Sequence, residues 1–156
     1  MSKFLKIGVA SFALVVASTI AASAESFTFS GSGKTMNQVM ASSGGTNIGG
    51  SYATSTTNTT YASGRKSTSQ NDCMQWTAQP GSMFTTQGVC TADAGDGKFS
   101  VIFSCQADAD GKGGDCWGRL TGMSGAYENK LGMVSWHSTN GDNNMTVTYE
   151  GTGMWN

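Results

Sequence analysis

One histidine is the side chain of this sequence that could most readily act as a general base. His137 is the only histidine, and a catalytic histidine needs a nucleophile and an orienting acid nearby. No G-x-S-x-G nucleophile motif accompanies it, because the glycines of Gly122–Gly125 have the wrong spacing. On strand parity His137 falls with Met133 and Ser135, which predicts a histidine at the end of a strand. No catalytic motif is found, and we lean toward a protein that is not an enzyme.

Aspartates in two turns raise the question of a metal site. In the segment Asp108–Asp115, the fifth and twelfth positions of a calcium loop would be Lys112 and Arg119, so the EF-hand pattern fails. An irregular calcium site between this turn and the acidic turn Asp93–Asp96 stays open as an alternative. Aspartate is common in hairpin turns without metal, and no cysteine or histidine spacing fits zinc. We therefore predict neither a metal nor another cofactor.

Aromatic and charged residues near the middle of the chain are candidates for ligand binding. Trp117 and Arg119 share one face of a predicted strand, opposite Leu120. Facing inward, they would give an aromatic wall with one cation, suited to an anionic or carbonyl-bearing ligand. Facing outward, which the pattern favours, Arg119 would be a solvated surface residue. The candidate ligand-binding residues are Trp117, Arg119, Tyr127, Trp136 and His137.

The N-terminus has the pattern of a secretory signal peptide over residues 1–24. Lys3 and Lys6 precede an apolar run, Ile7–Ile20, and Ala22-Ser-Ala24 supplies the small residues before the predicted cleavage site. The apolar run is shorter than the ~20 residues that a membrane-spanning helix needs. No later segment resembles a membrane span, so we expect a periplasmic or extracellular protein.

The remaining residues, 25–156, are expected to form a single domain. Without the two leader lysines the chain has seven basic and ten acidic side chains, a formal net charge of −3. A weakly acidic chain with so few lysines and arginines lacks the basic surface that nucleic-acid binding requires. We therefore expect no nucleic acid among its partners, while its oligomeric state is not predictable.

All four cysteines lie in this domain, at positions 73, 90, 105 and 116. An even number in an oxidising compartment predicts disulfide bonds, and four cysteines allow three connectivities. Cys105 and Cys116 are equidistant from Asp110-Gly111, a favoured centre of a two-residue type I′ hairpin turn. Cys73 and Cys90 are equidistant from Gly81-Ser82, beside the only proline, Pro80, so we favour pairs 73–90 and 105–116. The 90–105 pairing is the alternative, because Asp96-Gly97 lies almost midway between those two cysteines.

Alternating apolar and polar residues predict β-strands along most of the domain. Phe99, Val101, Phe103 and Cys105 share a face, and Gly118–Trp136 indicates two strands and their bend. Residues 42–70 are rich in Ser, Thr, Gly and Asn, and either form strands facing water on one side or are flexible. We predict an all-β, antiparallel up-and-down barrel of about eight strands with two disulfides. Such a barrel is either filled by side chains or holds one small ligand.

The order of glycines, aromatics and cysteines over about residues 70–155 resembles that of bacterial exported proteins of the allene oxide cyclase barrel-like group, related to plant dirigent proteins and the wider calycin set. The pattern comprises Gly88, Cys90, Asp93, Gly97 and Phe99, then Cys-Trp-Gly-Arg-Leu-Thr-Gly from Cys116, and a closing Gly-x-Gly-x-Trp at 151–155. The resemblance implies an antiparallel eight-stranded barrel. In plant members the barrel mouth guides cyclisation or radical coupling of small apolar substrates, but no catalytic motif here matches theirs residue by residue.

Three functions follow as hypotheses. The first is a non-enzymatic exported barrel that binds a small apolar or amphipathic ligand, or a protein surface. The second is a cyclase or isomerase that acts in the barrel cavity through shape and desolvation. The third is a structural or interaction protein of the cell envelope. An open lumen would favour the first two, and a lumen filled by Trp76, Phe103 and Trp136 would exclude them.

Overall fold

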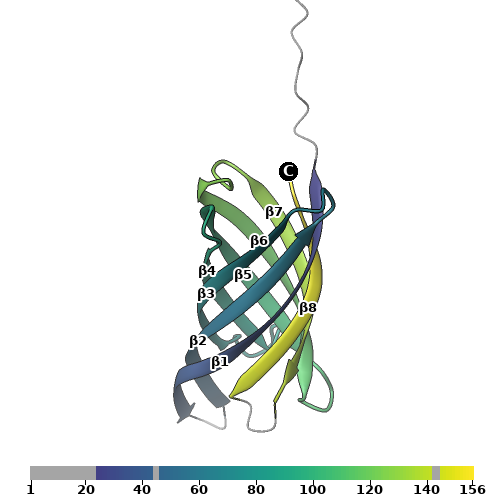
Figure 1. Cartoon of the computed structure of the whole chain (residues 1–156). Helices are drawn as coiled ribbons and strands as arrows, with labels where there is room; N and C mark the ends of the chain where they lie inside the picture. The colour runs from purple at the N-terminus through teal and green to yellow at the C-terminus, as the bar shows by residue number, and fades with distance from the viewer. Residues whose placement is uncertain (1–23, 44–45, 142–144) are drawn as a thin grey trace, which may run out of the picture.

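The computed structural model describes residues 24–43, 46–141 and 145–156. Of the predicted signal peptide, residues 1–23 lie outside this range. Eight antiparallel strands follow one another in sequence order around a closed barrel, as Figure 1 shows. The strands are β1 (Glu25–Ser43), β2 (Thr46–Tyr61), β3 (Lys66–Thr77), β4 (Thr86–Asp93), β5 (Gly97–Ala107), β6 (Gly113–Gly125), β7 (Leu131–Asn140) and β8 (Thr146–Trp155).

Closure comes from the pairing of the first strand with the last. Glu25 of β1 pairs with Trp155 of β8, and the ladder continues to Lys34 opposite Thr146. Every described strand therefore has two neighbours, although β1 beyond Thr35 and β2 before Gly49 pair only with each other. The predicted all-β, up-and-down barrel with two disulfides is confirmed. The described ranges contain no helix, and hence none long and apolar enough to cross a membrane.

The Ser/Thr-rich segment 42–70 forms strand in this structure over most of its length. β2 occupies 46–61 and pairs with β1 over a long ladder from Phe27–Tyr61 onward. β1 itself runs from Glu25 to Ser43 and so reaches into this segment. Of the two interpretations of this segment, the strand is the one observed.

An aromatic cluster fills one end of the barrel, which we call the closed end. The chain termini of the domain and the β2–β3, β4–β5 and β6–β7 connections lie here. Tyr127, from the β6–β7 connection, inserts into this end and is only 1% exposed. Its ring packs on Phe99 and Trp155, with ring centroids 4.9 and 5.3 Å away. Phe27 and Tyr61 complete the cluster, so this end has a packed core.

Polar contacts tie the turns at the closed end together. The hydroxyls of Tyr61 and Tyr127 are 2.8 Å apart. The Arg65 guanidinium lies over the Tyr61 ring, 3.6 Å from its centroid, and pairs with Asp96 at 3.3 Å. Arg65 also lies 3.7 Å from Glu25 at the start of β1. The β2–β3 turn is thus fastened to both neighbouring segments.

Both favoured disulfide pairings are present. Cys73 pairs with Cys90 directly across β3 and β4, and Cys105 with Cys116 across β5 and β6. The predicted two-residue type I′ turn at Asp110-Gly111 is wrong, because Asp108 N donates to Gly113 O across a longer loop in which only Gly111 has positive φ. The Cys105–Cys116 pairing is nevertheless correct, because the loop is centred midway between these two cysteines. Two disulfides are consistent with an oxidising environment.

Candidate functional site

The lumen beyond the aromatic cluster is a cavity of about 410 Å³. It opens at the other end of the barrel, the open end, where the β3–β4 and β5–β6 connections lie and where β7 ends and β8 begins. The lining runs from Phe27, Tyr61 and Trp155 at its base to Gly111 and Asn140 near the mouth. Its volume falls in the range of pockets that hold small molecules.

One wall of the cavity is apolar and comes from β4 to β7. Phe103 and Trp136 face the lumen, with ring centroids 5.5 Å apart in an edge-to-face arrangement. Val101 and Val134 continue this wall toward the core. Both disulfides also line the cavity. This wall offers aromatic and sulfur surface to a ligand.

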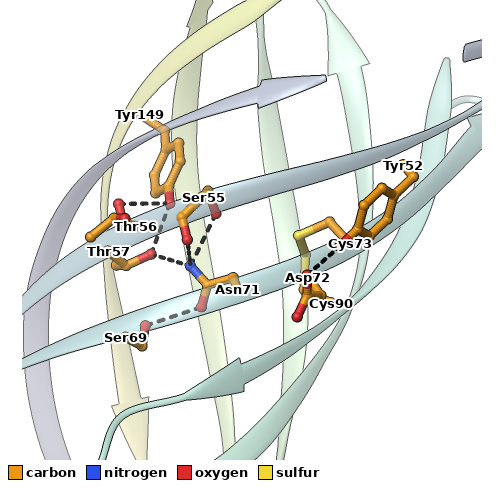
Figure 2. The surroundings of a disulfide bond; sticks show 10 residues. All are labelled: Tyr52, Ser55, Thr56, Thr57, Ser69, Asn71, Asp72, Cys73, Cys90 and Tyr149. Atoms are coloured by element: carbon orange, nitrogen blue, oxygen red, sulfur yellow. Dashed lines mark hydrogen bonds between the residues drawn. A yellow bond between two sulfur atoms is a disulfide. The ribbon is translucent and has the colours of Figure 1, made fainter. Parts of the chain in front are cut away.

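The other wall is polar and comes from β2, β3 and β8, as Figure 2 shows. Asn71 Nδ2 donates to Ser55 Oγ at 3.0 Å and to Thr57 Oγ1 at 2.8 Å. Ser69 Oγ donates to Asn71 Oδ1 at 3.0 Å. The Tyr149 hydroxyl lies 2.8 Å from Thr57 Oγ1. These five side chains, which we call the polar wall, form one hydrogen-bonded network facing the cavity.

The described lining is nearly free of charge. Lys34 is its one charged residue, and the alternation of β1 puts Phe29, Gly33 and Thr35 inside, leaving the Lys34 side chain exposed on the outer face. Among the described residues that line the cavity, none carries a carboxylate or an imidazole. The site can therefore offer apolar contact and neutral hydrogen bonds, and its ionisable lumenal groups are tyrosine hydroxyls.

Of the five predicted ligand-binding residues, Trp136 faces the cavity. Tyr127 belongs to the aromatic cluster at the closed end. Trp117 is 48% exposed and Arg119 is exposed as well, both on the outer face of β6. Gly118 takes the inward position between them, where a Cβ would lie 2.8 Å from a Val101 methyl. The favoured outward interpretation of Arg119 thus matches the structure.

His137 lies on the outside of β7 near the open end. Its Nδ1 is 2.9 Å from Asp115 Oδ1, and its Nε2 is 3.7 Å from Asp108 Oδ2. The hydrogen bond to Asp115 is the main cause that raises the pKa of His137 above its ordinary value. Asp108, Asp115 and His137 each offer one potential metal-ligand atom, and these three atoms lie within 4.8 Å of one another. Because each ring nitrogen faces a different carboxylate, the arrangement suits an imidazolium ion pair rather than three ligands around one metal ion.

The alternative calcium site between two acidic turns is not supported. The Asp93–Asp96 turn joins β4 to β5 at the closed end, where Lys98 pairs with Asp93 at 3.2 Å. The Asp108–Asp115 segment lies at the open end, between β5 and β6. Since β5 runs the length of the barrel between them, the two turns cannot share an ion.

The polar wall was not predicted from the sequence, although the parity of residues along the strands carried the signal. Once Cys73 is paired across the lumen face with Cys90, residues 69, 71 and 75 of the same strand must also face inward. Cys116 likewise places Gly118 and Leu120 inside and Trp117 outside. The disulfides therefore fix the facing of four strands. No known protein family and no curated protein matches this chain, and the likeness to the allene oxide cyclase barrel-like group stays a prediction.

Proposed function

We propose that this is an exported, non-enzymatic binding protein that holds a small amphipathic molecule in its barrel lumen. The ligand enters through the open end and rests above the aromatic cluster. The signal-peptide pattern and the two disulfides support export to the periplasm or the cell exterior.

The observation that carries this proposal is the one-ended cavity with two unlike walls. Phe103 and Trp136 present apolar surface, while Asn71 and Tyr149 belong to the polar wall. A lumen meant only for stability would be packed along its whole length, as the closed end is around Tyr127. Retaining about 410 Å³ of open space beside partly buried hydrogen-bonding groups fits a ligand site.

Binding is favoured over catalysis by the chemistry of the lining. General acid–base catalysis uses groups with a pKa near the working pH, and the described cavity residues include neither carboxylate nor imidazole. Catalysis by shape and desolvation alone is the second candidate, supported by the family resemblance and by the closed, apolar base of the lumen around Phe27 and Trp155.

A protein-binding role is a third candidate, favoured by exposed apolar side chains on the outer face. Met133 pairs with Met154 across β7 and β8, and Trp117 lies on the neighbouring strand β6. These side chains are 64%, 49% and 48% exposed, so they form an apolar patch on the barrel wall. This patch lies outside the lumen and would act independently of a bound small molecule.

The test is native mass spectrometry of the protein purified without denaturation from its own host. We expect a retained small molecule that is released on unfolding. Ala53→Phe would fill the lumen, because Ala53 lines the cavity, and it should abolish retention. Thr60→Phe adds the same ring on the exposed outer face of the same strand and should leave retention unchanged. Equal retention in both variants, or no molecule in the unaltered protein, would contradict lumenal binding.

A further inference from the structure

We propose that the ligand is a neutral, flat ring compound whose hydrogen-bonding groups lie along one edge. This inference rests on the proposed lumenal binding and specifies its ligand class. It follows from the positions of polar and apolar groups around the lumen and from the hydrogen-bonding capacity that the polar wall has left for a ligand. It also follows from the absence of charged side chains facing inward among the described lining residues.

At the level of Asn71 and Trp136, polar and apolar groups face each other across the lumen. In a closed eight-stranded barrel, strands four apart in order lie on opposite sides, so β2 faces β6 and β3 faces β7. Asn71 on β3 therefore stands across from Trp136 on β7. A chain-like amphiphile needs its polar group at one end and its apolar tail at the other. At this level the two environments divide the cavity from side to side, which suits a ring with one polar edge and apolar faces.

The polar wall has hydrogen-bonding capacity left for a ligand. Both Asn71 amide protons are used on Ser55 Oγ and Thr57 Oγ1, and Asn71 Oδ1 accepts from Ser69. The Ser55 oxygen accepts from Asn71, which leaves its own proton able to donate to a carbonyl. The second lone pair of Asn71 Oδ1 can accept from an N–H or O–H. A carboxamide or a similar neutral group satisfies both at once.

The lining of the cavity also disfavours a charged ligand. The inward-facing side chains among the described lining residues include no cation, because the Lys34 side chain projects from the outer face. An anion moved from water into this lumen would lose part of its hydration without gaining a counter-ion, which weakens its binding. A neutral compound avoids that loss.

Isothermal titration calorimetry with three probes tests the assignment. 2-Naphthamide is the neutral ring with a polar edge, 2-naphthoate is its anion of nearly the same shape, and decanamide is a linear amide. We expect 2-naphthamide to bind at least about tenfold more tightly than either of the others, since one buried, satisfied hydrogen-bonding group or one unpaired charge is worth that factor.

Two matched variants locate the binding. Asn71→Leu removes the central amide of the polar wall and should weaken 2-naphthamide binding by about tenfold. Asn58→Leu makes the same exchange on the outer face, where Asn58 accepts from Thr68 at 2.8 Å, and should leave binding unchanged. If Asn71→Leu fails to fold, Ser55→Ala removes the donating hydroxyl alone and should weaken binding by several-fold.

The outcomes separate this inference from the proposed function. Tighter binding of 2-naphthoate or decanamide that Ala53→Phe abolishes would overturn the ring-edge assignment and leave lumenal binding standing. Binding of any probe that Ala53→Phe leaves unchanged would overturn both. No binding of 2-naphthamide, or equal effects of Asn71→Leu and Asn58→Leu, would overturn the ring-edge assignment.

Discussion

The hydroxyl oxygens of Tyr61 and Tyr127 lie 2.8 Å apart at the closed end of the barrel. Tyr61 ends β2, and Tyr127 comes from the β6–β7 connection on the far side of the lumen. Their side chains are among the most buried of the described residues. This contact joins a loop to the barrel wall and seals one end, which is why the cavity has a single mouth.

Tyr127→Phe should therefore destabilise the protein by about 1–2 kcal/mol, because the buried Tyr61 hydroxyl loses its partner. Tyr127→Ala should cost about 3–5 kcal/mol, since it also removes a packed ring. Tyr52→Phe is the control, because the Tyr52 hydroxyl bonds Asp72 on the outer surface. Urea denaturation of the three variants measures these differences. Equal costs for Tyr127→Phe and Tyr52→Phe would contradict the sealing role.

Burial, together with the hydrogen bond between the Tyr61 and Tyr127 hydroxyls, raises the pKa of Tyr61 to about 12. A raised pKa means that the folded state favours the neutral phenol. The associated stability is fully present below the unfolded value of 10.0 and is lost as pH rises toward 12. We expect the free energy of unfolding to fall across that window. In Tyr61→Phe this fall should be smaller, and an unchanged alkaline slope would show that Tyr61 does not titrate in this way.

Gly153 pairs directly with Phe27 across β1 and β8, and the Phe27 ring fills the space that a side chain at 153 would need. Gly153→Ala should destabilise the barrel by about 1–3 kcal/mol through overpacking. In a Phe27→Leu background the same exchange should cost less, because the smaller side chain can yield. Thr152→Ala, on the exposed outer face, serves as control. If the two substitutions lower the free energy of unfolding additively in the double variant, the proposed contact between the side chains at 27 and 153 is contradicted.

The strands that could be predicted are those with apolar side chains facing the core. Phe99, Val101 and Phe103 recur at every second position, and β5 runs through them as expected. β2 gave no such signal, because its inward residues Ser55 and Thr57 line a polar cavity while its outer face is also Ser and Thr. Period-two patterning disappears when both faces are polar. The sequence of a strand beside a polar lumen therefore resembles that of a flexible segment.

The site was harder to predict for a related reason. Its polar wall is assembled from Ser, Thr, Asn and Tyr on three strands, residue types that are unremarkable in sequence and become a network only through the barrel register. Trp117 and Arg119 attracted attention because they are distinctive residue types, yet they face outward. The outward direction of these two side chains could have been deduced by combining the Cys105–Cys116 pairing with the inward position of Phe103.

The two disulfides should contribute similarly to stability. They close loops of 17 and 11 residues in sequence, and the chain-entropy estimate depends only on the logarithm of loop length, giving about 3 kcal/mol for each. We expect Cys73→Ala/Cys90→Ala and Cys105→Ala/Cys116→Ala each to lower the free energy of unfolding by about that amount. Denaturation in urea under non-reducing conditions measures it. A loss below about 1 kcal/mol for either pair would show that this cross-link is not a stabilising one.

His137 should make the mouth of the barrel sensitive to pH. Its hydrogen bond with Asp115, and the further negative charges of Asp108 and Glu150, raise its pKa above 6.5. A raised histidine pKa stabilises the fold fully below the unfolded value, and that contribution is lost as pH rises through the folded value. Because the chain has one histidine, its proton NMR titration is unambiguous. Asp115→Asn should lower the measured pKa toward 6.5, whereas Asp110→Asn should leave it nearly unchanged. A wild-type value at or below 6.5 would contradict the ion pair.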